Sequence, residues 1–123
     1  LNHHRTLFAG RCAEWFIEAG FIAVADVLPS ENVVCIKLHG LEFTQPMRLG
    51  EIAHFQSKII YAGRSSLKVY TNLKRKPDRD PILTGFLTFV HVDEDGNSKP
   101  HNITLELSEA EDIELNKIAA ALQ

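Results

Sequence analysis

Residues 9–28 are the most constraining feature of the sequence, because they combine helical spacing with an almost wholly apolar surface. Thr6 is a candidate N-terminal cap, and Pro29 predicts the end of the helix. Apolar side chains recur three or four positions apart, as in an α-helix: Cys12, Trp15, Phe16, Ala19, Ile22, Ala23 and Val27. The charged exceptions form one narrow stripe: Arg11, Glu14 and Glu18. We therefore expect a long helix that other structure surrounds.

Strand signals follow this helix. Alternating or continuous apolar runs predict strands over residues 33–43, 51–62, 66–73, 82–92 and 103–107. The first should bend at Gly40, and the fourth, which is apolar on both faces, should be central. Ser108 is expected to cap a short C-terminal helix. A sheet of about five or six antiparallel strands that curls around a long central helix is the hotdog fold, an α+β architecture. The chain does not begin with Met, which leaves room for a further strand before the helix.

The composition predicts a single globular domain and argues against nucleic acid and membrane as partners. The 123 residues predict a single domain over 1–123, and the 45% hydrophobic and 24% charged fractions are those of a globular protein. A net charge of -3 argues against nucleic acid, and no apolar run has the roughly 20 residues that span a membrane. There is no signal-peptide pattern, so a cytoplasmic location with two reduced, buried thiols is expected. The six histidines and two cysteines show no zinc-ligand spacing, so we expect no metal site.

The opening segment resembles a known signature. Residues 2–10, Asn-His-His-Arg-Thr-Leu-Phe-Ala-Gly, are similar to the motif of bacterial acyl-CoA thioesterases, an Asn followed by Gly-Thr-Leu-Phe-Gly-Gly. The similarity continues through most of the chain, at Trp15, Glu18-Ala19, Phe43, Pro46, Gly50-Glu51, Gly63-Arg64-Ser65-Ser66, Thr88-Phe89-Val90, Val92-Asp93 and Gly96. The resemblance implies a homodimer, or a tetramer or hexamer built from dimers. It also implies active sites at the dimer interface and no cofactor besides the coenzyme A of the substrate, whose acyl chain lies beside the central helix.

The sequence departs from this motif at three positions. Arg5 and Ala9 replace glycines, and Ile17 occupies the position, seven residues after the last glycine, where the family usually carries an acidic residue. The customary catalytic carboxylate is therefore absent from that position.

Hydrolysis of a thioester needs a polarised carbonyl and an activated water. Gly10 is a candidate for the first role, with a free N–H at a helix start and no side chain to block the substrate. Glu18, or less favourably Glu14, is the candidate base, unless both pair with Arg11. The resemblance gives Asn2 the role of orienting water or substrate. His4, like the adjacent His3, is a further candidate base because histidine titrates near neutral pH.

Two basic segments are candidates for binding the coenzyme A portion. The resemblance implies that Arg64, Ser65 and Ser66 contact pantetheine or phosphate, although the segment also suits a plain hairpin turn. Arg75, between two lysines, could meet the nucleotide phosphates, although the sequence slightly favours a plain solvated loop here.

The leading hypothesis is thus a thioester hydrolase that converts an acyl-CoA to free acid and coenzyme A. The alternative is a catalytically impaired subunit that binds acyl-CoA or acyl carrier protein without turnover, as Ile17 suggests. A hydratase on the same fold is a weaker reading, because no matching His/Asp or His/Glu motif is present.

Overall fold

The computed structural model describes residues 3–45, 52–76 and 79–123, with side chains described from Gly10 onward. The elements follow in the order α1 (His3–Ala25), a 3₁₀-helix η1 (Ser30–Asn32), β1 (Val33–Phe43), β2 (His54–Ala62), β3 (Ser66–Lys74), β4 (Leu83–His91) and α2 (Ala110–Ala120). Four of the expected strands therefore form at the predicted places.

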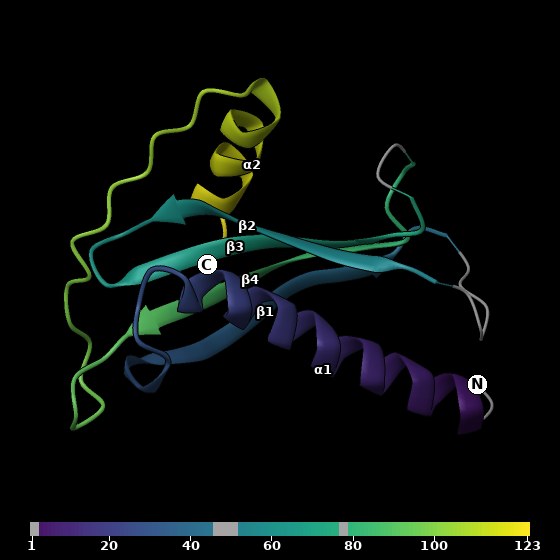
Figure 1. Cartoon of the computed structure of the whole chain (residues 1–123), viewed down its shortest axis with the longest axis horizontal. Helices are drawn as coiled ribbons and strands as arrows, with labels where there is room; N and C mark the ends of the chain where they lie inside the picture. The colour runs from purple at the N-terminus through teal and green to yellow at the C-terminus, as the bar shows by residue number, and fades with distance from the viewer. Residues whose placement is uncertain (1–2, 46–51, 77–78) are drawn as a thin grey trace.

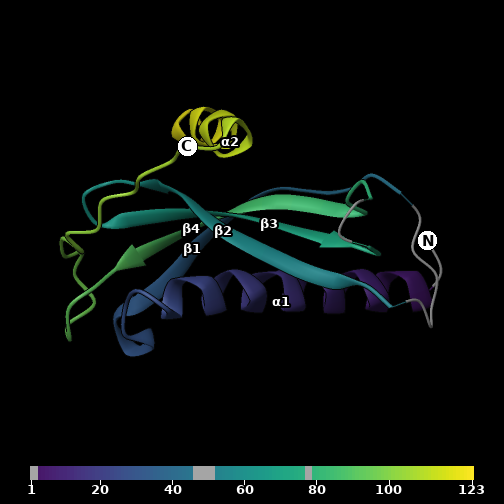
Figure 2. The same cartoon turned by 45° about the horizontal axis from the view of Figure 1, so that its top comes forward.

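The strands make one antiparallel sheet in the order β1-β4-β3-β2. The apolar β4 is central, as its sequence predicts. The register of β1 shifts between His39 and Glu42, where Gly40 has a φ of +58°, so the predicted bend at this glycine is a bulge. The long helix α1 lies along one face of the sheet and α2 lies on the other (Figure 2). This is the α+β arrangement expected from the sequence.

The main core lies between α1 and the sheet. Alternate residues of β3 point into it and are at most 3% exposed: Leu67, Val69, Thr71 and Leu73. Phe16 of α1 packs edge-on against Phe55 of β2, with ring centroids 6.4 Å apart, and Phe21 packs against Phe89 of β4 at 5.9 Å. These aromatic contacts fix the helix along the sheet.

The helix begins earlier than expected, at His3 rather than residue 9, and ends at Ala25. Arg5 and Ala9 explain the early start, because both are better helix formers than the glycines of the signature they replace. Thr6 consequently lies inside the helix and is not its cap.

The helix is also less enclosed than expected. Cys12, Phe16 and Val24, spaced by multiples of four, are buried against the sheet. Trp15 and Ile22 remain 46% and 62% exposed, because the sheet covers only one side of the helix in a single chain.

The expected strand at 103–107 does not form. This segment is extended but belongs to no strand, and its apolar residues Ile103, Leu105 and Leu107 are only half-buried. Asn102, at a φ of +59°, redirects the chain, and the N–H of Ile103 is taken by Nδ1 of His101 at 2.9 Å. The alternation indicated extended backbone correctly, but a strand also needs a pairing partner.

Helix α2 is fixed to the outer face of the sheet by polar contacts. Its N-cap is Glu109 rather than Ser108, without a side-chain cap. Lys68 Nζ donates to the carbonyls of Ala119 and Leu122, both at 2.9 Å, which places a positive charge at the helix C-terminus. Within the described part of the chain, neither helix has the length and hydropathy needed to cross a membrane.

Candidate functional site

The exposed side of α1 carries the candidate carboxylates. Glu14 and Glu18 are both exposed, on the side of the helix that also presents Trp15 and Ile22. Neither glutamate has an ion pair with Arg11 or any other residue that the structure describes. Among the described residues, Glu18 is therefore an exposed carboxylate without an ion-pair partner, on the same side of the helix as the exposed Trp15 and Ile22 and accessible to a ligand or to another subunit.

Gly10 does not sit at a helix start. It lies inside α1, where its N–H is directed to the carbonyl four residues earlier, so the predicted free N–H at this position is wrong. Gly10 is nevertheless exposed, and a Cβ built on it would meet nothing within 4 Å. What the residue offers is a bare stretch of helix backbone that a ligand can approach closely.

The other opening residues are only partly described. Asn2 lies outside the described residues, and His4 is in α1 with its side chain outside them. By helix geometry, His4 and Glu18 are about 21 Å apart along the axis, whereas Gly10 and Glu18 are about 12 Å apart. His4 and Glu18 therefore cannot act on the same atom within one chain.

Arg64 and Ser65 lie in the turn between β2 and β3, as expected, and Ser66 is the first residue of β3. Their carbonyls are all engaged: Arg64 O accepts from the N–H of His101 at 3.2 Å, Ser65 O from the N–H of His91 at 2.7 Å, and Ser66 O from Gly63 N at 2.9 Å and His101 Nε2 at 2.9 Å. This network fixes the turn and leaves the exposed Arg64 side chain for a ligand.

Arg75 lies at the opposite end of β3. Its Nη1 donates to Oε1 of Gln45 at 2.9 Å. Nine residues of extended chain separate it from Ser66, or roughly 30 Å. Figure 1 shows the β2–β3 turn at one end of the sheet and the N-terminus of α1 at the other, where β3 ends. One chain thus brings Arg75 to the same end as the opening segment, but not Arg64, Ser65 or Ser66.

Sequence reasoning did not identify a buried polar pair on the sheet. His39 Nε2 and Thr88 Oγ1 are 2.8 Å apart between β1 and β4, and both residues are buried. Burial, and then the positive charges of Lys37 and Lys68, lower the pKa of His39. The pair stabilises the sheet with a neutral imidazole, and neither residue belongs to the predicted site.

The two thiols differ in position. Cys12 is buried and Cys35 is exposed, so only the first meets the expectation of burial. Both are free. Burial raises the pKa of the Cys12 thiol, and partial desolvation of the Cys35 sulfur raises the pKa of that thiol although the residue is exposed. Within the described ranges, no three His, Cys, Asp or Glu residues group as metal ligands would.

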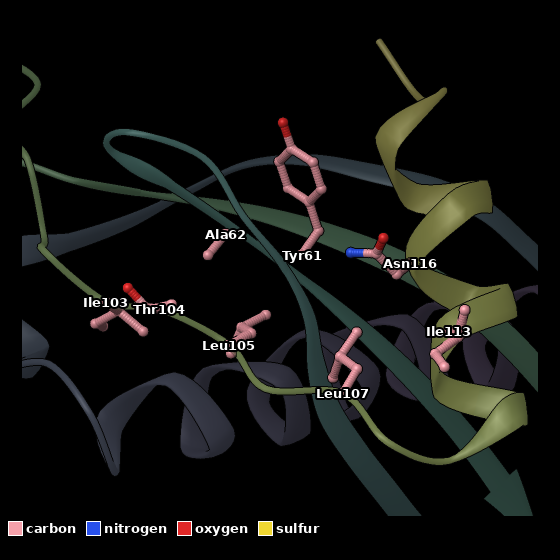
Figure 3. A pocket seen from close by; sticks show the side chains of 8 residues that line it. All are labelled: Tyr61, Ala62, Ile103, Thr104, Leu105, Leu107, Ile113 and Asn116. Atoms are coloured by element: carbon pink, nitrogen blue, oxygen red, sulfur yellow. The ribbon is translucent and has the colours of Figure 1, made fainter.

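A hollow of about 500 Å³ opens on the outer side of β2. Figure 3 shows its lining from β2, the 103–107 segment and α2: Tyr61, Ala62, Ile103, Thr104, Leu105, Leu107, Ile113 and Asn116. No predicted site residue is among them, so this hollow is separate from the candidate site.

A long helix along an antiparallel sheet, with candidate carboxylates on the open side of the helix, defines a hotdog-fold protein. The chain belongs to the thioesterase superfamily, whose family model matches residues 4–82.

Individual relatives agree with this family. The chain is 26% identical over 103 residues to the uncharacterized acyl-CoA thioester hydrolase YkhA of Bacillus subtilis strain 168, a match covering 80% of the chain and 59% of that protein. The chain therefore spans somewhat over half of this curated relative. An acyl-CoA hydrolase of Staphylococcus aureus, solved with butyryl coenzyme A, is 24% identical with a TM-score of 0.81, covering 97% of this chain and 71% of that one. A hexameric hotdog fold thioesterase of Campylobacter jejuni is 26% identical with a TM-score of 0.63, covering 74% and 73%.

Proposed function

We propose that the protein is an acyl-CoA thioesterase, which hydrolyses an acyl-CoA to the free acid and coenzyme A. The proposal rests on the superfamily match together with one observation of the site: Glu18 is an exposed carboxylate on the open side of α1, with no ion-pair partner among the residues that the structure describes. In this role Glu18 takes a proton from water as the water oxygen attacks the thioester carbon, and then returns it to the departing thiolate. Glu18 thus supplies the carboxylate that the family usually carries at the position occupied here by Ile17.

The remaining candidates support this step. Gly10 and Glu18 of one chain are about 12 Å apart along α1, so Gly10 and Asn2 act on the same thioester from the second subunit. There Gly10 lets the thioester approach the helix backbone, and the Asn2 amide orients the water or the carbonyl oxygen. His4 is the second candidate base. The acyl chain lies along the open side of α1, beside Trp15 and Ile22. Arg64, Ser65, Ser66 and Arg75 contact the coenzyme A portion of the substrate.

The active site is completed by a second subunit. The candidate substrate contacts at the two ends of β3 lie roughly 30 Å apart in one chain. In a two-fold dimer, the Ser66 end of β3 in one subunit would lie beside the Arg75 end of β3 in the other. The surface for such a pair is apolar: Trp15, Ile22, Val34, Ile36 and Phe43 are each between 43% and 62% exposed on α1 and the edge strand β1. The hexameric relative from Campylobacter jejuni supports self-association of this kind.

Release of free thiol from a panel of short, long and aromatic acyl-CoAs tests the function. The wild-type protein should hydrolyse at least one, and Glu18→Gln should reduce kcat by about 100-fold or more. Glu94→Gln, which changes an exposed acid in the turn after β4, is the matched control and should retain full activity.

The possible outcomes test the role of Glu18 separately from the thioesterase activity itself. Full activity of Glu18→Gln would exclude this residue as the base. Saturable acyl-CoA binding by calorimetry without thiol release would replace the enzyme with the alternative, a binding subunit. Neither binding nor release would exclude both.

A further inference from the structure

His101 joins the segment after β4 to the turn between β2 and β3, and Figure 1 shows this segment passing beside the turn. The residue is 9% exposed, and no motif of the sequence marks it. Its ring reaches Ser66, 35 residues earlier in the chain, with Nε2 at 2.9 Å from the carbonyl oxygen. The contact is hidden in the sequence, because it depends on how the chain folds back after β4.

The two ring nitrogens of His101 have complementary partners. Nδ1 accepts the N–H of Ile103 at 2.9 Å and so carries no proton. The neutral ring then has its proton on Nε2, and the Ser66 carbonyl oxygen that faces this atom can only accept. The turn of the chain at Asn102, which has a φ of +59°, places the Ile103 N–H against the ring. One tautomer therefore uses both nitrogens.

The same residue holds the main chain on both sides of Ser65. The His101 N–H donates to the Arg64 carbonyl at 3.2 Å, while the ring donates to the Ser66 carbonyl. Ser66 O also accepts from Gly63 N at 2.9 Å, across the turn. Two bonds from one residue thus fix the main chain at Arg64 and Ser66, whereas the Arg64 side chain remains exposed.

The order that His101 adds at this turn bears on binding more than on the fold. The β2–β3 ladder and the Gly63 N–H bond already close the hairpin without the ring. The ring fixes the main chain that carries Arg64 and Ser66, two of the candidate coenzyme A contacts. A guanidinium on a looser turn would lose more conformational freedom on binding, and that entropy cost lowers affinity.

We propose that His101 is a positioning residue for the coenzyme A contacts at the β2–β3 turn, through the bond from its Nε2–H to Ser66 O. It acts through Arg64 and Ser66 and does not itself touch the ligand. The identity of the ligand rests on the proposed function.

Calorimetric titration of the full chain with coenzyme A tests this role without hydrolysis. The amide nitrogen of glutamine is as many bonds from Cα as Nε2 of histidine, so His101→Gln keeps the donor to Ser66 O and should bind within about twofold of the wild type. The oxygen of asparagine instead replaces Nδ1, so His101→Asn keeps only the acceptor for Ile103 N–H and should bind about tenfold more weakly. His39→Asn is the matched control. It removes a buried histidine bond to Thr88, away from the turn, and should leave coenzyme A binding unchanged.

A double-variant cycle with Arg64→Ala separates positioning from a general loss of stability. Because His101 acts partly through Arg64, His101→Asn should weaken binding by only about threefold or less when Arg64 is already alanine. Where an acyl-CoA is hydrolysed, His101→Asn should raise KM and leave kcat unchanged.

Four results of the titrations would overturn the proposal: wild-type affinity of His101→Asn, equal weakening by His101→Asn and His101→Gln, full additivity with Arg64→Ala, or no binding of coenzyme A to the wild-type protein. A fall in kcat at unchanged KM would also overturn it. Binding of coenzyme A that depends on His101, without thiol release from any acyl-CoA, would contradict the proposed function and leave the positioning role standing.

Discussion

Gly20 of α1 lies directly against Leu87 of β4, and a Cβ built on Gly20 would be 2.2 Å from Leu87 Cδ1. Both residues are buried, and the ring of Phe89 lies 3.5 Å from the same point. The helix approaches the sheet this closely because position 20 has no side chain.

Gly20→Ala should therefore destabilise the protein by about 1–3 kcal/mol, because the added methyl group forces Leu87 to move within a packed core. Gly10→Ala is the matched control. It adds the same methyl group to the same helix in open space, and helix propensity predicts a gain of up to about 1 kcal/mol. Urea unfolding of both variants measures the difference, and an equal effect at the two positions would contradict the packing argument.

His39 should make stability depend on pH. Its pKa is lowered in the folded protein, mainly by burial, so the unfolded chain binds a proton that the folded chain excludes. The contribution of neutral His39 to the free energy of unfolding is fully present above the pKa of histidine in the unfolded chain, about 6.5, and it is lost as the pH falls below that value. His39→Gln should flatten the dependence of the unfolding free energy on pH between about 5 and 7. Unfolding curves at several pH values compare the variant with the wild type, and parallel profiles would contradict this assignment.

Asn116 should control the docking of α2. The register of β2 shifts between Ile59 and Tyr61, and Asn116 Nδ2 donates to the carbonyl of Ile60, at this irregularity, at 2.7 Å. Asn116→Ala should cost about 1 kcal/mol and speed amide hydrogen exchange in α2. The exposed Glu114→Ala, on the same helix, should leave exchange nearly unchanged. Faster exchange across the whole sheet as well would indicate global destabilisation instead.

The exposed apolar surface of β1 should drive self-association. Ile36 is 60% exposed on this edge strand, and Ile36→Lys should shift the protein toward monomer in analytical ultracentrifugation, because a desolvated ammonium opposes the contact. Ile118 on α2 is 44% exposed, and Ile118→Lys should leave the assembly unchanged. A monomeric wild-type protein would contradict the proposed interface.

The sequence predicted the sheet well because its signals are local. Alternation in β3, the turn at Arg64 and the bulge at Gly40 each depend on a few neighbouring residues. The 103–107 segment has the same alternation without forming a strand, because pairing depends on a neighbour distant in sequence.

The orientation of α1 could not be predicted in the same way. A helix that is apolar nearly all round does not reveal which side meets the sheet. The close contact between Gly20 and Leu87 determines which side of α1 faces the sheet. Trp15 was therefore expected in the core but is 46% exposed. The pairing of Gln45 with Arg75 was equally hidden, since it depends on β1 and β3 ending at the same edge of the sheet.

The separation of Arg64 from the opening segment along the sheet has a consequence for mixtures of variants. In a pair that shares its sites, a subunit altered at Arg64 and a subunit altered at Arg75, which lies at the same end of the sheet as the opening segment, each disable a different half of the binding site. Co-assembly of the two would concentrate both defects in one site and leave the second site intact. Two inactive proteins would then recover up to about half of the wild-type activity per mixed dimer when refolded together.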